Sequence, residues 1–150
     1  MDADQLIHVL GLQPHPEGGW YAETWRAPAE EEQRPASTGI YFLLRAGERS
    51  HWHRVDADEL WLHHDGDPLR LSVAASGRSP EHHVLGRNIA AGQAPQVVVP
   101  AGQWQAAEPL GEWTLVSCVV APGFRFDGFE LAPPDWHPGQ PDTETGAVPS

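Results

Sequence analysis

Residues 59–74, ELWLHHDGDPLRLSVA, decide the fold class, because they form the pattern of two short strands joined by a tight turn. Side chains two apart share one face of a strand, so Glu59, Trp61 and His63 are expected on one face of the first strand. The turn contains the Asp, Gly and Pro residues that favour a chain reversal. The rest of the chain continues in the same way, which predicts a β-sandwich or β-barrel.

Turn residues separate the short apolar stretches along nearly the whole chain, which holds 15 Gly and 15 Pro. A short helix is expected over about residues 2–11, capped by Asp2 or Asp4 and ended by Gly11. No helical stripe follows residue 12. The strands are expected at residues 20–26, 38–45, 50–54, 59–64, 69–74, 82–85, 96–99, 103–108, 113–120 and 124–131.

Length and composition limit the class of protein. The 150 residues suit one domain, expected over 1–138, with a loosely ordered tail at 139–150. A net charge of −12 argues against binding to nucleic acid. No apolar run approaches the ~20 residues that cross a bilayer, so no membrane association is expected. The single Cys118 excludes an internal disulfide and is expected to be a buried, inert thiol in a cytoplasmic protein.

One set of polar residues carries the chemistry. His51 and His53 are two apart and are therefore expected on one face, and the same holds for Gln103 and Gln105. If these strands and that of Glu59 are neighbours, two imidazoles, a carboxylate and a carboxamide converge. Imidazole nitrogen and carboxylate oxygen are the ligands that hold divalent first-row metals.

The residues around this set resemble the two conserved motifs of the cupin superfamily. The first motif consists of a glycine, two histidines one residue apart, a glutamate and a second glycine, and it is matched by residues 47–53, Glu59 and Gly66. The second motif, Pro-x-Gly followed by a ligand, is matched by residues 99–105.

The chain is more closely similar to one branch, the Cupin_5 or DUF985 family, from about Leu10 to Pro138. The matching segments are residues 14–21, 23–26, 37–44, 53–61, 66–69 and 122–131. This resemblance implies a double-stranded β-helix, the cupin or jelly-roll barrel, which is commonly a homodimer. It does not imply one reaction, since cupins include isomerases, epimerases, lyases, dioxygenases and simple binders.

A metal site and a metal-free polar pocket both remain open at this stage. The metal ligands would be His51, His53, Glu59 and Gln105, holding Zn, Ni, Mn or Fe. Two departures from the resemblance count against a metal. Five residues lie between His53 and Glu59, one or two more than usual, and Gln105 stands where metal-dependent cupins have histidine. An amide oxygen is a weak ligand for these metals.

Glu59 is expected to act as a ligand, as a general base or as a partner in a structural ion pair. Burial inside an apolar barrel would raise its pKa towards neutrality. His53 and Glu59 are therefore the catalytic candidates. The expected pocket residues, for which core packing is the alternative role, are Tyr41, Trp61, His63, Gln103 and Gln105.

Segment 14–19 contains His15 and two glycines, and it either fixes a turn or forms a lid over the pocket. The pairs at 63–64 and 82–83 cannot chelate, because adjacent histidines face opposite ways.

The leading hypothesis is an isomerase, epimerase or lyase that acts on a small polar metabolite inside the barrel. The alternative is a non-catalytic binder of a sugar-like ligand. A metal-dependent dioxygenase is the least favoured class, because it needs redox-active iron with open positions and Gln105 stands where the fourth ligand would be histidine.

Overall fold

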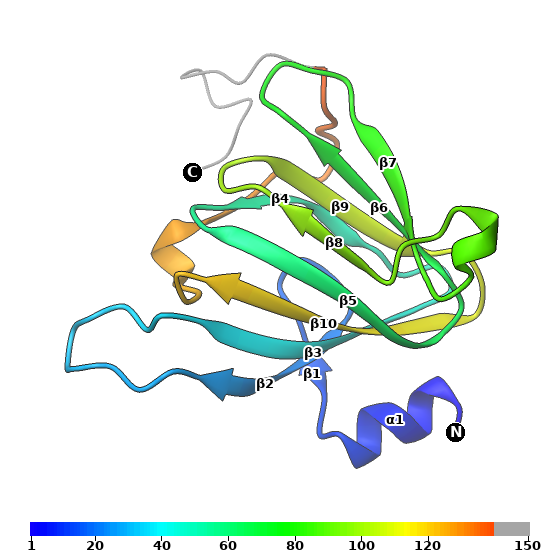
Figure 1. The fold of residues 1–150 in the computed structure, drawn as a ribbon, viewed down its shortest axis with the longest axis horizontal. Coiled ribbons are helices and arrows are strands. Elements are labelled where there is room, and N and C mark those ends of the chain that lie inside the picture. Colours follow the sequence, from blue (N-terminus) through cyan, green and yellow to red (C-terminus); the bar gives the residue numbers. More distant parts are fainter. Residues whose placement is uncertain (140–150) are drawn as a thin grey trace.

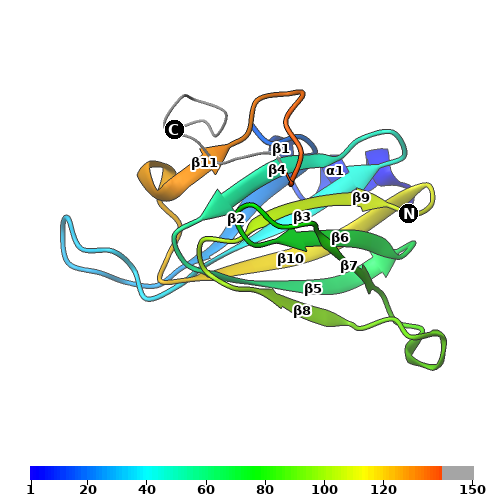
Figure 2. The same cartoon turned by 90° about the horizontal axis from the view of Figure 1, so that it is seen from above.

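The computed structural model describes residues 1–139 as two antiparallel sheets that face each other (Figures 1 and 2). The sheet here called sheet A has the strand order β1-β2-β3-β10-β5-β8, and sheet B has the order β11-β4-β9-β6-β7. The strands are β1 (Gln13–Pro14), β2 (Trp20–Arg26), β3 (Thr38–Arg45), β4 (Ser50–Val55), β5 (Asp58–Gly66), β6 (Leu69–Ala74), β7 (Glu81–Leu85), β8 (Gln96–Val99), β9 (Trp104–Pro109), β10 (Trp113–Ala121) and β11 (Phe129–Leu131).

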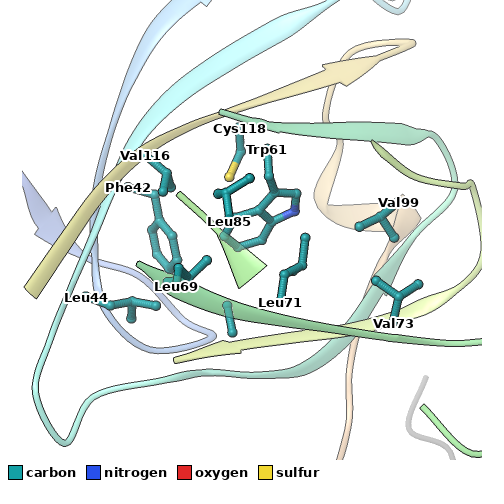
Figure 3. Close-up of a cluster of buried hydrophobic side chains, with 11 residues drawn as sticks. Phe42, Leu44, Trp61, Leu69, Leu71, Val73, Leu85, Val99, Val116 and Cys118 are labelled. Atoms are coloured by element: carbon teal, nitrogen blue, oxygen red, sulfur yellow. The ribbon is translucent and has the colours of Figure 1, made fainter. Parts of the chain in front are cut away.

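The barrel interior is packed with apolar side chains from both sheets, as the expected alternation requires. Phe42, Trp61 and Val116 from sheet A meet Leu69 and Leu71 from sheet B, and all five are almost fully buried. Figure 3 shows these side chains pointing into the space between the sheets. Since sequence-distant strands pair throughout, the all-β jelly-roll prediction is confirmed.

A short helix, α1 (Ala3–Val9), precedes the barrel. The Asp2 side chain caps its N-terminus and accepts a hydrogen bond from the backbone N–H of Gln5 at 2.8 Å. Apolar residues of the helix pack with Leu43 and Leu115, whose side chains lie on the outer face of sheet A. The helix therefore covers one face of the barrel and contributes nothing to its interior.

The expected strand at 124–131 is partly wrong. Phe126–Gly128 forms a 3₁₀ turn, and only Phe129–Leu131 pairs with β4. The two-residue strand β1 and a 3₁₀ turn at Ile89–Ala91 were not expected from the sequence. The expected loose tail at 139–150 lies, from residue 140 onward, outside the described residues, and the domain boundary at 138 stays a prediction. Within residues 1–139, no helix is long and apolar enough to cross a membrane.

Candidate functional site

A small cavity of about 40 Å³ lies between the sheets at the end of the barrel where β3 and β5 begin and β4 and β10 end. Polar and apolar side chains share its wall, and several of the polar ones are almost fully buried. The lining residues are Glu17, Glu23, Thr38, Ile40, His53, Val55, Glu59, Cys118, Val120, Phe124 and Phe129.

A chain of two hydrogen bonds orients Glu59. The indole N–H of Trp61 donates to Oε1 of Gln105 at 2.8 Å, and Nε2 of Gln105 donates to Oε1 of Glu59 at 2.9 Å. An indole nitrogen can only donate, so the oxygen of the Gln105 amide must face Trp61 and its NH₂ group must face Glu59. The strands of Glu59 and Gln105 lie in opposite sheets, so this chain joins the two walls of the barrel.

Burial raises the pKa of Glu59 from 4.5 to about 7. The side chain is only 7% exposed, and desolvation disfavours its charged form. Hydrogen bonds from Gln105 and from the Cys118 thiol act in the opposite direction and only partly offset this effect. Glu59 can therefore both release and accept a proton near neutral pH. Cys118 itself is buried and free, as expected, and burial raises the pKa of its thiol.

His53 presents one defined ring nitrogen for further contacts. Its Nδ1 lies 2.7 Å from the backbone carbonyl oxygen of His51, so Nδ1 carries the hydrogen and Nε2 carries the lone pair. Within residues 1–139, no hydrogen bond of the protein occupies Nε2. Burial lowers the pKa of His53 to about 4, which keeps the ring neutral at physiological pH.

The structure adds Glu17, a residue that was not identified from the sequence. Glu17 is 9% exposed and lines the cavity from the segment at residues 14–19. Its Oε2 accepts a hydrogen bond from the hydroxyl group of Ser50 and lies 3.2 Å from Nδ1 of His53. The two glycines that follow Glu17, Gly18 and Gly19, are the sequence feature that could have indicated its role.

The two glycines bring this segment against the barrel wall. Gly18 has a φ of 108°, and a Cβ atom there would lie 2.0 Å from the carbonyl oxygen of Arg49. This close approach lets the backbone N–H of His51 donate to the carbonyl oxygen of Glu17 at 2.8 Å. The expected close approach of the backbone at this segment is thus confirmed.

Glu17 holds its proton more strongly than an ordinary carboxyl group. Its pKa is raised well above 4.5, first by burial and then by the nearby charge of Glu59. The geometry agrees, because Oε1 of Glu17 lies 3.3 Å from Nδ1 of His15, and that nitrogen already accepts the backbone N–H of Glu17. Burial lowers the pKa of His15 to about 4. The raised pKa of Glu17 and the lowered pKa values of His15 and His53 therefore all favour the neutral forms in these contacts.

The prediction that His51 and His53 share a face is wrong. The pairing of β4 with β9 shifts register between Ser50 and His53, which adds one residue to β4 as a β-bulge. The inward positions become Ser50 and His53, while Nε2 of His51 lies 2.8 Å from the carbonyl oxygen of Pro133. His51 therefore lies outside the cavity.

Three of the expected pocket residues also lie outside the cavity. Tyr41 faces outward, with its ring centroid 6.3 Å from that of His64. His63 does face inward but lies beyond Trp61, where its Nε2 is 3.0 Å from the carbonyl oxygen of Asp67. Gln103 belongs to the turn before β9 and does not line the cavity. Trp61 and Gln105 reach the site indirectly, through the hydrogen-bond chain to Glu59.

The residues present do not fit the expected four-ligand metal set. His51 is turned away, and the oxygen of the Gln105 amide is taken by the Trp61 indole. The Gln105 NH₂ group that faces Glu59 is a donor and cannot bind a cation. Across the described residues, no three His, Cys, Asp or Glu side chains lie close enough together to hold a metal ion.

A second hollow, of about 190 Å³, lies on the outer face of sheet B beside Arg70, Ser72, His82 and Ala106. Arg70 contacts Glu108 at 3.4 Å, with both side chains about half exposed, and the second arginine of the hollow, Arg49, lies 3.0 Å from Nδ1 of His51 in an exposed contact. Water screens such a pair, so this hollow offers no desolvated acid or base. The inner cavity is therefore the candidate site.

Residues 4–132 match the family described as Cupin_5, Cupin superfamily (DUF985). The chain belongs to this family. Two solved structures cover most of this cupin and are similar in sequence as well as in fold. A protein of Shewanella oneidensis is 41% identical, with a TM-score of 0.83 and coverage of 87% of this chain and 84% of the other. A hypothetical protein from Leishmania major is 34% identical, with a TM-score of 0.80 and coverage of 87% and 86%.

More distant structures share the fold alone. Oxalate decarboxylase of Bacillus subtilis is 13% identical, with a TM-score of 0.61 and coverage of 79% of this cupin and 29% of that enzyme. Another structure of the same enzyme concerns its Mn(II) centres. No curated protein matches the chain.

Proposed function

We propose that this cupin is an acid–base enzyme that moves a proton on a small polar metabolite, most simply an isomerase or epimerase acting beside a carbonyl group. One observation carries the proposal. Glu59, with a pKa of about 7, faces the same buried cavity as the neutral His53. A pair of groups that titrate so differently is characteristic of acid–base sites.

Glu59 is the group that would move the proton. In its ionised form it takes a proton from the carbon next to the carbonyl, and the electron pair of the broken C–H bond moves to give an enediolate. The proton on Glu59 exchanges with water, and a proton is then returned to carbon. Return to the neighbouring carbon, while the hydroxyl proton passes to the former carbonyl oxygen, gives the isomer, and return to the other face of the first carbon gives the epimer. The hydrogen bond from Gln105 holds the carboxylate in position at 2.9 Å.

Glu17 and His53 suit the oxygen atoms of such a substrate. The raised pKa of Glu17 favours its protonated form, and in that form the carboxyl group can donate a hydrogen bond to a developing oxyanion. The lone pair on Nε2 of His53 can accept a hydrogen bond from a neighbouring hydroxyl group. A lyase would use the same three groups, with loss of a leaving group from the enediolate in place of reprotonation.

Hydrogen exchange in D₂O tests the proposal without knowledge of the natural substrate. Hydroxyacetone, dihydroxyacetone and glyceraldehyde are incubated with the protein, and ¹H NMR follows deuterium replacing the C–H hydrogens next to the carbonyl. We expect exchange above the buffer rate with the wild-type protein, and a loss of at least about 100-fold in Glu59→Gln. Glu108→Gln is the matched control, because Glu108 is exposed on the outer face of sheet B.

Two results would contradict the proposal. Exchange that persists at the wild-type rate in Glu59→Gln removes this residue as the base. An absence of exchange with all three compounds, together with saturable binding of any of them, identifies a non-catalytic binding protein.

A further inference from the structure

We infer that the inner cavity takes an uncharged ligand and rejects an anion of the same size and shape. This inference rests on the proposed function, because it names the charge class of the molecule bound at the same site. The carboxyl groups in the cavity wall, the lack of a cationic side chain among its lining residues and the depth of its burial carry the argument.

The lining residues include three carboxyl groups, those of Glu17, Glu23 and Glu59, and no Lys or Arg. The basic residue closest to them in sequence is Arg26, which is bound to Glu23 by two hydrogen bonds of 2.9 and 2.8 Å. Both side chains of that pair are about half exposed, and Arg26 itself does not line the cavity. An anion in the cavity would therefore meet no opposite charge.

Burial makes this lack of an opposite charge decisive. Glu17, His53 and Glu59 are 9%, 1% and 7% exposed, so a ligand that touches them must leave its water behind. A charge moved into such an environment without a partner is strongly disfavoured. Ionised Glu59 adds direct repulsion between like charges.

An uncharged ligand finds matched partners in the same place. Nε2 of His53 offers an acceptor and the protonated Glu17 offers a donor, while Phe124, Phe129 and Val120 supply an apolar wall. Hydroxyl and carbonyl groups use such partners without losing an ionic hydration shell. The ligand class is therefore a small hydroxy or carbonyl compound without a carboxylate or phosphate group.

Glu59 is the group in this cavity whose charge changes between pH 6 and 8, because its pKa is about 7. His15 and His53 are neutral over this range, since the pKa of each is lowered to about 4. Glu17 and Cys118 face Glu59 with pKa values raised well above their ordinary ones. Rejection of an anion should accordingly strengthen as the pH rises through 7.

Acetamide, acetate and acetamidinium form a matched test set, because the three are planar, nearly equal in size and differ in charge. Each is titrated into the ¹⁵N-labelled protein at pH 6 and pH 8, with the Gln105 side-chain amide and the Trp61 indole N–H as reporters. These groups are hydrogen-bonded in series to Glu59 and therefore sense the cavity. We expect acetamide to bind at least tenfold more tightly than acetate at pH 8, with a smaller ratio at pH 6.

Variants separate the charge effect from shape. Glu59→Gln should reduce the acetamide-to-acetate ratio at pH 8 and remove its pH dependence, whereas Glu108→Gln should leave both unchanged. Should Glu59→Gln fail to fold, the pH dependence of the wild-type ratio remains a sufficient test. Acetate binding as tightly as acetamide overturns the inference and leaves the proposed function standing. Tighter binding of acetamidinium at pH 8 than at pH 6 supports the inference, because ionised Glu59 then pairs with the cation. No binding of any of the three overturns the proposed function, and this inference with it.

Discussion

Replacing Glu59 by Gln changes how the free energy of unfolding depends on pH. The stability of the variant relative to the wild type should be greater at alkaline pH than at acid pH. The pKa of Glu59 is about 7 in the folded protein and about 4.5 when the chain is unfolded. Above pH 4.5 the unfolded chain therefore releases a proton that the folded protein keeps. The wild type loses stability as the pH rises from 4.5 through 7, and Gln, which does not ionise, avoids this loss.

The size of the effect follows from the two pKa values. At about 1.4 kcal/mol per pKa unit, the rise from 4.5 to about 7 corresponds to about 3 kcal/mol, most of which is lost between pH 5 and pH 8. The new amide also changes hydrogen bonds beside Cys118, but this contribution does not depend on pH and cancels in the comparison. Removing the charge of Glu59 also lessens the rise in the pKa of Glu17, which acts in the same direction.

Urea unfolding followed by tryptophan fluorescence, at pH 5 and pH 8 and constant ionic strength, measures this difference. The free energy of unfolding of Glu59→Gln minus that of the wild type should be about 2–3 kcal/mol larger at pH 8 than at pH 5. A difference that is the same at both pH values, to within about 0.5 kcal/mol, would refute the raised pKa and the acid–base role built on it.

Three further substitutions test other parts of the site. The pKa of His15, lowered to about 4, makes the wild type lose stability as the pH falls. In urea unfolding, His15→Gln should therefore lose about 2 kcal/mol less stability than the wild type between pH 7.5 and pH 4.5. Gly18→Ala should cost at least about 2 kcal/mol more than Gly77→Ala in thermal unfolding, since both glycines have positive φ but only the first would meet a backbone oxygen. Gln105→Leu should cost about 2–4 kcal/mol, because two buried polar partners lose their hydrogen bonds, and NMR titration should show a still higher pKa for Glu59.

For regular strands, the sequence predicted which side chains face the barrel interior. Alternation along 59–63 correctly placed Glu59, Trp61 and His63 inside the barrel, because β5 pairs with β10 without a register shift up to His63 and each step turns the side chain over. Burial of Glu59 and a raised pKa followed from the same pattern. The resemblance to Cupin_5 predicted the fold, and the strand alternation predicted a convergence of polar side chains, of which His53 and Glu59 line one cavity.

Irregular backbone and contacts between distant segments could not be predicted in this way. One extra residue in β4 turns His51 out of the barrel. Such a β-bulge arises in the pairing of β4 with β9, so the alternation within residues 50–55 alone does not reveal it. Glu17 reaches the cavity because Gly18 lies against the backbone of a segment more than 30 residues away. Such a contact depends on tertiary packing that a local pattern does not contain, although the two adjacent glycines indicated a close approach.

The anchoring of Glu17 also affects how fast a ligand can enter. A cavity of about 40 Å³ has room for about three water molecules, so a larger metabolite needs its wall to move. Segment 14–19 is held to β4 by the hydrogen bond between Glu17 and His51. If this segment is the part of the wall that moves, its release limits the rate of association. Stopped-flow traces should reach a rate plateau as ligand concentration increases, and the plateau should rise when that attachment is weakened.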